Sequence, residues 1–183
     1  MESDTIIKPV YTAGIFIDYE NLLISFMNRY NISPLDAQAR TIKSITSTMQ
    51  YLRSHNIKVA VNEAFADWRD YKGAARALFK QGVKTVQVYA LPHKSSADIE
   101  LSLRIFDTIA FGPEHLDIYV LLGGDRDYLS ISRRIMAHDR GAMVVGLEKS
   151  LSHWLVKEVG PANCVLIDPE TGNLNFNDHN FGQ

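Results

Sequence analysis

The stretch LDIYVLLGGDRDYLSISRRI, residues 116–135, decides the fold. Its apolar run, which ends at Leu122, has the character of a buried β-strand, and the pattern that starts near Tyr128 is helical. Between the two lie a pair of glycines and then Asp125 and Asp127, separated only by an arginine. Carboxylates this close repel each other unless a positive charge lies between them or water surrounds both. The stretch therefore predicts a buried strand that ends at a charged site, neutralised by solvent, an arginine or a metal ion.

The rest of the chain repeats this alternation of apolar runs and helical patterns. The other strand-like runs cover residues 13–18, 58–66, 84–91, 141–147 and 164–168. Strands that are apolar throughout, with helices between them, indicate a mostly parallel sheet covered on both faces. The sequence thus predicts an α/β protein with a three-layer Rossmann-like fold, in which helices flank a mostly parallel central sheet. This domain is expected to span residues 13–168, after an N-terminal extension (1–12) and before a polar tail or linker (169–183).

Length and composition are typical of one soluble globular domain, with 183 residues and a formal net charge of -2. The single cysteine, Cys164, excludes an intrachain disulfide, and the N-terminus lacks the pattern of a signal peptide, so we expect a reducing, cytoplasmic location. No apolar run approaches the length of a membrane span. The histidine spacings do not match a zinc site and no glycine-rich nucleotide-binding loop occurs, so neither zinc nor a nucleotide cofactor is expected.

Acidic residues follow several of the predicted strands. Asp18 ends the first strand, Asp67 lies just past the second, and Asp125 and Asp127 follow the run described above. Ligands of such folds bind outside the carboxyl ends of the strands, where the strand order reverses. Each acid also has a structural alternative, because Asp18 and Asp127 could cap helices and Asp67 could be a turn residue. These alternatives explain poorly why all four fall at one edge, and such oxygen ligands suit Mg²⁺ or Mn²⁺.

A further acid, Asp98, is expected to join this group from a helix. At about 100° per residue, Asp98 falls in line with the apolar Leu101 and Ile105. The opposite, solvent-facing side is expected to carry Glu100, Arg104, Asp107 and Thr108. Asp98 also lies in the first turn, so its alternative role is to stabilise the start of the helix, where Ser95 or Ser96 can cap.

Four segments carry a resemblance to a known family. They are FIDYENLL (16–23), FADWRDY (65–71), KSSADIELSL (94–103) and YVLLGGDRDYLSISRRI (119–135). Together, and in this order, they resemble the NYN domain, a branch of the PIN-like nucleases, and are most similar to its LabA-like (DUF88) group. The resemblance implies a metal-dependent ribonuclease with a Rossmann-like sheet, with RNA as substrate and Mg²⁺ or Mn²⁺ as cofactor.

The resemblance also assigns roles to individual residues. Asp18, Asp98 and Asp125 match the family's metal site, with Asp127 beside them and Asn21 as a polar helper, and these five are the predicted catalytic residues. In addition, Asp67 matches an acid that is frequent at its position among LabA-like members. One departure stands out, because many relatives carry another acid where this chain has Arg104, and its loss could weaken metal binding or slow turnover.

Basic residues near the acids are the predicted substrate contacts. The helical pattern from 69 to 80 places Arg69, Lys72, Arg76 and Lys80 on one stripe, which suits a phosphate backbone. The alternative for this stripe is a solvated amphipathic face. The full set predicted to bind substrate is Asp67, Arg69, Lys72, Arg76, Lys94, Ser96 and Arg126. The aromatic residues Tyr19, Trp68, Tyr71 and Tyr128 flank the same acids and could either stack on unpaired bases or pack internally.

Three functions are compatible with these residues. The first, which we favour, is a metal-dependent ribonuclease, most simply an endoribonuclease, in which the ions activate water and stabilise the leaving oxygen. The second is a phosphomonoesterase of the haloacid-dehalogenase type. That family needs Asp-x-Asp after the first strand, and this chain has Asp18-Tyr19-Glu20 there, which argues against this function. The third is a non-catalytic RNA-binding or regulatory module, for which Arg104 is the argument. A homodimer is left open.

Overall fold

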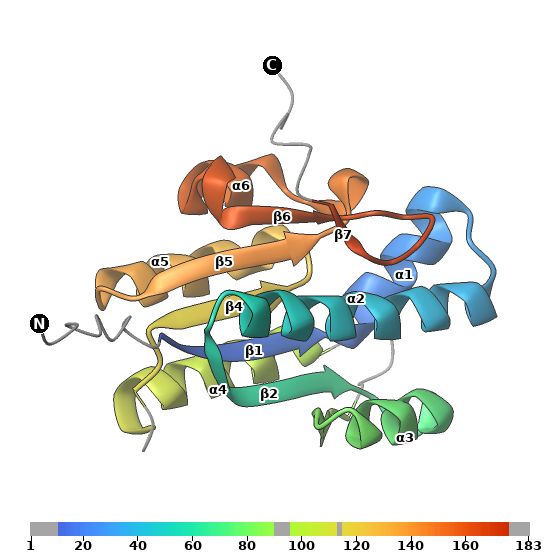
Figure 1. Cartoon of the computed structure of the whole chain (residues 1–183), viewed down its shortest axis with the longest axis horizontal. Coiled ribbons are helices and arrows are strands. Elements are labelled where there is room, and N and C mark those ends of the chain that lie inside the picture. Colours follow the sequence, from blue (N-terminus) through green and yellow to red (C-terminus); the bar gives the residue numbers. More distant parts are fainter. Residues whose placement is uncertain (1–10, 90–95, 113–114, 176–183) are drawn as a thin grey trace, which may run out of the picture.

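The computed structural model describes residues 11–89, 96–112 and 115–175. In this part of the chain the strands form one seven-stranded sheet in the order β3-β2-β1-β4-β5-β6-β7 (Figure 1). β1 to β6 run parallel, and β7 pairs antiparallel with β6. The strands are β1 (Thr12–Asp18), β2 (Lys58–Ala66), β3 (Lys84–Gln87), β4 (Ile118–Leu122), β5 (Gly141–Gly146), β6 (Cys164–Ile167) and β7 (Leu174–Asn175).

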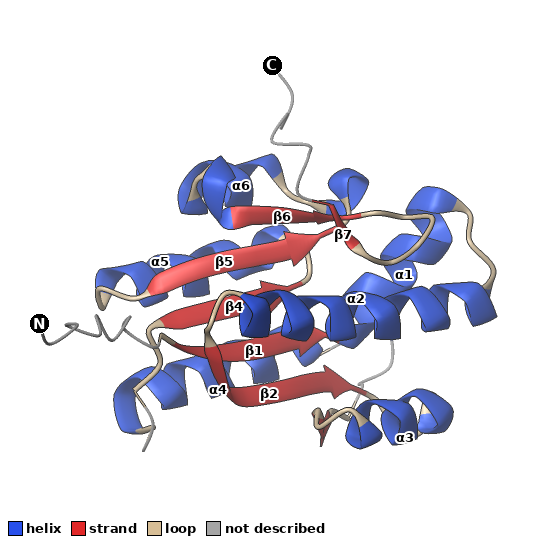
Figure 2. Ribbon diagram, viewed as in Figure 1, coloured by secondary structure: helices blue, strands red, loops and turns tan. Residues whose placement is uncertain are grey.

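Helices connect the strands and cover both faces of the sheet (Figure 2). They are α1 (Tyr19–Tyr30), α2 (Pro34–Ser54), α3 (Lys72–Lys80), α4 (Ala97–Phe111), α5 (Leu129–Ala137) and α6 (His153–Val159). Short 3₁₀ turns complete the chain, namely η1 (Arg126–Tyr128), η2 (Glu148–Ser150) and η3 (Pro161–Asn163). The predicted three-layer α/β fold with a mostly parallel central sheet is therefore confirmed. No helix within these described residues has the length and apolarity needed to cross a membrane.

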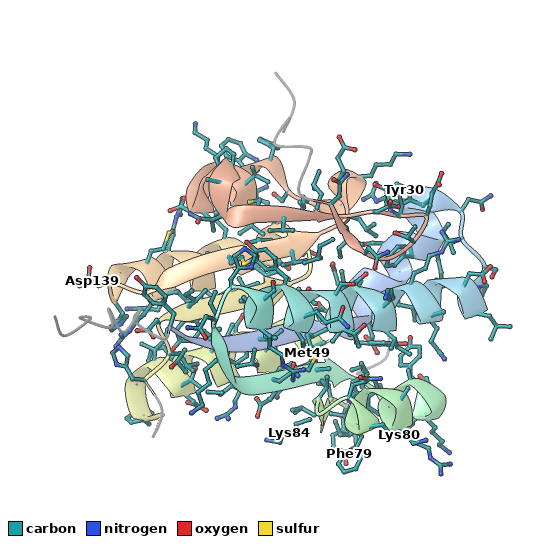
Figure 3. All side chains as sticks on the ribbon, in the orientation of Figure 1. Tyr30, Met49, Phe79, Lys80, Lys84 and Asp139 are labelled. Carbon is teal, nitrogen blue, oxygen red and sulfur yellow. The ribbon has the colours of Figure 1, made fainter. Side chains whose placement is uncertain are left out.

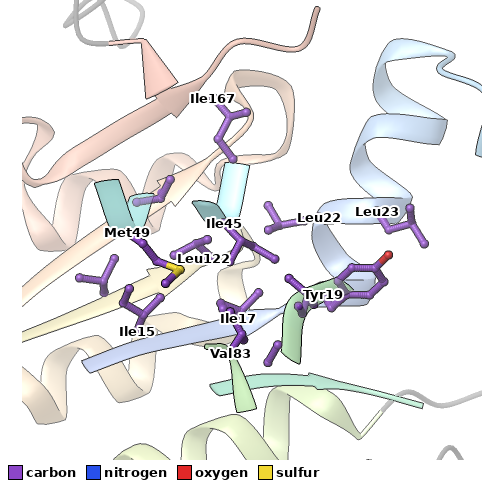
Figure 4. Close-up of a cluster of buried hydrophobic side chains, with 14 of the residues drawn as sticks. Ile15, Ile17, Tyr19, Leu22, Leu23, Ile45, Met49, Val83, Leu122 and Ile167 are labelled. Carbon is purple, nitrogen blue, oxygen red and sulfur yellow. The ribbon is translucent and has the colours of Figure 1, made fainter. Parts of the chain in front are cut away.

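The alternating side chains of β1 divide the interior into two cores. Ile15 and Ile17 point to one face, where they pack with the apolar sides of α1, α2 and α3 (Figure 4). Phe16 points to the other face and packs with α4, α5 and α6. This is the pattern expected when successive residues of a strand face opposite sides of a sheet that is buried on both. β1 is thus central, and its C-terminal end is held firmly in position.

The strand order reverses beside β1. From β1 the chain builds outward through β2 and β3, and it then returns to place β4 on the other side of β1. Ile17 pairs in register with Leu122, so both strands end at the same level. Helices leave these two strand ends toward opposite faces, which opens a crevice between them. Asp18 and the Gly123-Gly124 pair lie at this crevice.

Two segments differ from the sequence-based expectation. The helix expected from residue 69 begins only at Lys72, because residues 67–71 form a turn in which the amides of Asp70 and Tyr71 bond to the carbonyls of Asp67 and Trp68. The first residues of the expected polar tail form a turn and then β7, which pairs with β6 through Leu174. Residues 176–183 lie outside the described part.

Candidate functional site

One cleft of about 460 Å³ opens at the crevice between β1 and β4. Asp18 reaches it from the end of β1, Asp125 from the turn after β4, and Asp98 from the first turn of α4. Asn21, in the first turn of α1, lies beside them. The three acids that the sequence predicts as metal ligands, and the predicted polar helper, are thus brought together although they come from separate parts of the chain.

Asp18 is the buried centre of this group. It caps α1 by accepting a hydrogen bond from the Asn21 amide at Oδ1, 3.0 Å away, and its Oδ2 accepts one from the Tyr128 hydroxyl. Burial raises the pKa of Asp18 to about 6, and the charges of Glu20 and Asp98 add to the rise, although both hydrogen bonds oppose it. The capping alternative is therefore correct, and it coexists with a place in the cleft. A carboxylate held at both oxygens has a well-defined orientation.

The hydroxyl group of Tyr128 lies close enough to all three acids for their charges to affect its pKa. Its side chain is buried beneath Asp18, and burial raises the pKa of its hydroxyl well above the usual value. The charges of Asp18, Asp98 and Asp125 all raise that pKa further. The hydroxyl consequently stays protonated and serves as a hydrogen-bond donor to Asp18.

Asp98 carries an unsatisfied acceptor. Its Oδ1 is buried and has no hydrogen-bond partner among the described residues. Ser96, the N-cap residue of α4, makes no side-chain cap. A buried polar atom without a partner costs about 1–3 kcal/mol, and more when it is charged. An open acceptor in a cleft with two further carboxylates is an arrangement that a positively charged group would stabilise.

Gly123 and Gly124 explain how the chain leaves β4 so close to Asp18. Gly123 has φ +149, a conformation that favours glycine, and a Cβ there would lie 3.1 Å from the Tyr128 ring and 3.5 Å from Asn21 Oδ1. The Gly124 amide donates to Asn21 Oδ1 at 3.2 Å, and a Cβ on Gly124 would come within 2.5 Å of the Ser150 carbonyl. Gly124 therefore has no room for a larger residue, whereas at Gly123 the backbone conformation and the nearby Tyr128 ring both disfavour one. This close approach is what carries Asp125 to the cleft.

Asp127 lies beside the cleft rather than in it. It is exposed on η1, and its amide donates to Asp125 Oδ1 at 3.3 Å, so Asp125 and not Asp127 caps this turn. Asp127 shares a second, smaller hollow of about 270 Å³ with Asp98 and Ser102. The two neighbouring aspartates are thus tolerated for a local reason, since they line different hollows and both are exposed to solvent.

Asp67 and Arg69 form a pair of their own. Arg69 donates hydrogen bonds to both oxygens of Asp67, from Nε to Oδ1 at 2.8 Å and from Nη2 to Oδ2 at 2.5 Å. Gln87 also donates to Oδ1, at 2.9 Å. The Arg69 guanidinium holds the pKa of the Asp67 carboxyl well below its usual range. Neither residue lines the acidic cleft. The expected stripe therefore loses its first member, because Arg69 lies outside α3 and is engaged by Asp67.

The other predicted basic contacts are dispersed. Lys72, Arg76 and Lys80 are exposed on α3, which carries Lys80 at the edge of the molecule (Figure 3), and none of the three lines the cleft. Arg126 is exposed on η1, directly after Asp125. Lys94 lies outside the described residues.

The aromatic residues near the acids are mostly internal. Tyr19, Trp68 and Tyr128 are buried, and the Tyr19 ring packs on Trp68 and Tyr71 with ring centroids 5.0 and 5.3 Å apart. Figure 4 shows Tyr19 among the apolar side chains of the core. The Trp68 indole also donates to the Val86 carbonyl at 2.9 Å. The alternative that these three side chains stack on bases is therefore wrong, because they are buried and pack internally.

Arg104 does not enter the cleft. It lies about 9 Å along α4 from Asp98 at 1.5 Å per residue. Its Nε binds Glu63 Oε2 at 2.7 Å, and Lys84 binds the same buried carboxylate at 2.9 Å. The expectation that α4 turns Arg104 and Thr108 to solvent is also corrected, because Thr108 is buried and the Arg104 side chain is only 39% exposed. Arg104, the residue that departs from the family pattern, thus forms an ion pair with the buried Glu63.

Several lining residues were not predicted from the sequence. Beyond Asn21, the cleft continues along α1 past Ile24, Ser25, Asn28 and Arg29, and Glu20 also borders it. Glu20 accepts a hydrogen bond from the Asp67 amide at 3.1 Å. The spacing of three, four, seven and eight residues after Asn21 marks one helical face, so a signal for this extension was present in the sequence.

The donor set suits a hard divalent cation by its chemistry. Asp18, Asp98 and Asp125 offer carboxylate oxygens, which are the ligands that Mg²⁺ and Mn²⁺ prefer. The open Oδ1 of Asp98 and the raised pKa of Asp18 are both features that a cation would relieve. As the side chains are placed, no three His, Cys, Asp or Glu residues of the described ranges stand close enough to hold a metal ion.

Comparison with known families agrees with this architecture. The family model described as the NYN domain matches residues 12–159, which includes β1 to α6 and every residue of the acidic cleft. No curated protein matches the chain at a significant level. With the match covering most of the 183 residues, the chain belongs to the NYN domain family.

Proposed function

We propose that the protein is a metal-dependent ribonuclease, acting as an endoribonuclease on RNA phosphodiester bonds, and that it belongs to the LabA-like group of NYN proteins. The NYN domain is a nuclease-type domain of the PIN-like superfamily and is generally RNA-related, and nucleases of this superfamily typically use divalent metals. The observation that carries the proposal is the buried Oδ1 of Asp98, which has no partner among the described residues, in a cleft shared with Asp18 and Asp125.

Asp18, Asp98 and Asp125 would hold Mg²⁺ or Mn²⁺. When bound, such an ion lowers the pKa of its water and stabilises negative charge on the attacking and leaving oxygens of a phosphodiester. The protein's part is to orient these carboxylates, and a bound cation would favour the ionised form of Asp18, whose pKa burial raises. The Asn21 amide and the Tyr128 hydroxyl orient Asp18, and the tight Gly123-Gly124 turn presents Asp125.

Asn21 and Asp127 have supporting roles in this proposal. The Gly124 amide holds Asn21 Oδ1, which leaves the Asn21 Nδ2 group as a donor at the cleft for a phosphate oxygen. Asp127 lies across the neighbouring hollow from Ser102 and adds negative potential beside Asp98. Ser96, Lys72, Arg76 and Arg126 are proposed as outer contacts to substrate, whereas Asp67 and Arg69 would contribute only as a pair.

The alternative is an RNA-binding module without turnover. Its argument was that Arg104 replaces an acid of the family site. The pairing of Arg104 with Glu63 weakens that argument, because the guanidinium is kept out of the cleft and does not oppose a bound cation. The catalytic proposal is therefore preferred.

Metal dependence of RNA cleavage tests the proposal. An internally labelled single-stranded RNA incubated with the protein in millimolar Mn²⁺ or Mg²⁺ is expected to yield internal fragments. EDTA should stop the reaction, and excess Mn²⁺ should restore it. If the RNA is bound but stays intact with either metal, the non-catalytic alternative is correct and the proposed activity is wrong.

A further inference from the structure

The acidic cleft extends along one face of α1, away from the three carboxylates. Its lining continues from Asn21 to Ile24 and Ser25, and then to Asn28 and Arg29. At 1.5 Å per residue, Asn21 and Arg29 lie about 12 Å apart along the helix axis. The cleft is thus longer than a metal site requires, and its far end has a different chemical character from its acidic end.

Arg29 is the basic residue at that far end. It is exposed, and no carboxylate pairs with it anywhere in the described ranges. By contrast, Arg69, Arg104 and Arg133 are each held by an acid. The guanidinium of Arg29 is therefore available to an external anion, and its planar fork suits two oxygens of one phosphate.

The middle of the α1 face can accommodate the uncharged part of a strand. Ile24 is 48% exposed although it is a large apolar residue, and it lies between the acidic end and Arg29. Asn28 is exposed beside Arg29, and it can donate and accept hydrogen bonds. A strand that lies along this face would meet first an apolar side chain, then an amide and then a cation. These groups can contact a sugar, a base edge and a phosphate, respectively.

We propose that this α1 face is a binding subsite for single-stranded RNA next to the cleaved bond, with Arg29 bound to a backbone phosphate beyond it. The inference rests on the proposed ribonuclease function. It places the nucleotides next to the cleaved bond along α1 and leaves the basic side chains of α3 as outer contacts. A single strand is favoured because the contacts follow one narrow helix face, whereas an RNA duplex is recognised across a wide surface.

Salt-dependent RNA binding tests this subsite. The probe is a fluorescein-labelled, ten-nucleotide single-stranded RNA, and the parent protein carries Asp125→Asn so that the RNA stays intact. Adding Arg29→Gln is expected to weaken binding about fivefold to tenfold at low salt. The log-log salt slope should become shallower by about 0.7, the value for one phosphate contact on a single strand. Arg29→Lys keeps the charge and should retain the parent slope.

Lys43→Gln on α2 is the matched control, because Lys43 is exposed and does not line the cleft, and the change removes the same charge. It should leave affinity and slope unchanged. In the otherwise wild-type protein, Arg29→Gln should raise KM without lowering kcat, since Arg29 is not at the reacting atoms.

Each outcome decides the inference. An unchanged affinity and slope for Arg29→Gln, or an equal loss for Lys43→Gln, would overturn the subsite while RNA cleavage by the wild-type protein still stood. If the parent protein binds no RNA and the wild type cleaves none, the proposed function fails and the subsite fails with it.

Discussion

Replacement of Asp125 by asparagine is expected to reduce RNA cleavage by about a hundredfold or more while leaving the fold intact. The loss follows from removing a carboxylate ligand, since even residues that only support metal ligands are worth about 10–100-fold. The fold should persist because an asparagine oxygen can still accept the hydrogen bond from the Asp127 amide. Single-turnover cleavage and a thermal unfolding curve measure the two effects.

Asp107→Asn is the control for this substitution. Asp107 is exposed on α4 beyond the turn that carries Asp98, and it does not line the cleft. The same change of charge should therefore alter cleavage by less than about twofold, as expected for a surface position. Equal loss of activity in both variants would mean that net charge, and not the cleft, controls the reaction.

Without metal, the stability of the protein is expected to fall as the pH rises from about 4 to 6, through the ionisation of Asp18. The pKa of Asp18 is 3.8 ordinarily and about 6 in the fold, so the native state keeps a proton that the unfolded chain has already released. The relative stabilisation is complete below pH 3.8 and is lost as the pH passes through about 6. The full difference corresponds to about 3 kcal/mol.

Asp18→Asn isolates this effect, because asparagine is also a good N-cap and carries no charge. Urea unfolding in EDTA should show that the variant gains on the wild type by about 2 kcal/mol between pH 4 and pH 7. The comparison cancels the other titrating groups that both proteins share. A stability difference that does not change with pH would contradict the buried, repelled state assigned to Asp18.

The acidic cleft was accessible to sequence reasoning because a simple rule positions it. Apolar runs located β1 and β4, and in a parallel sheet the residues after neighbouring strands meet at one edge. Asp18 and Asp125 follow from this rule alone. Asp98 followed from helical periodicity, since it shares the buried side of α4 with Leu101 and Ile105. These predictions needed only local patterns and one rule of topology.

Errors arose where distant contacts override local patterns. The helical pattern around Arg69 was real, but burial of Trp68 and its hydrogen bond to Val86 hold these residues in a turn. The pattern of α4 alone turns Arg104 to solvent, whereas its partner Glu63 lies 41 residues earlier within β2. Neither contact can be seen in the spacing of the residues that it affects.

Binding of Mn²⁺, measured by loss of the free-ion signal in electron paramagnetic resonance, tests the acidic cleft most directly. We expect the wild-type protein to bind Mn²⁺ with a dissociation constant in the millimolar range or below, and Mg²⁺ to compete for the site. Asp98→Asn should weaken this binding at least tenfold, because it removes a proposed ligand, whereas Asp107→Asn should not. Equal Mn²⁺ binding by the wild-type protein and Asp98→Asn, or no binding by either, would contradict a metal site formed by Asp18, Asp98 and Asp125.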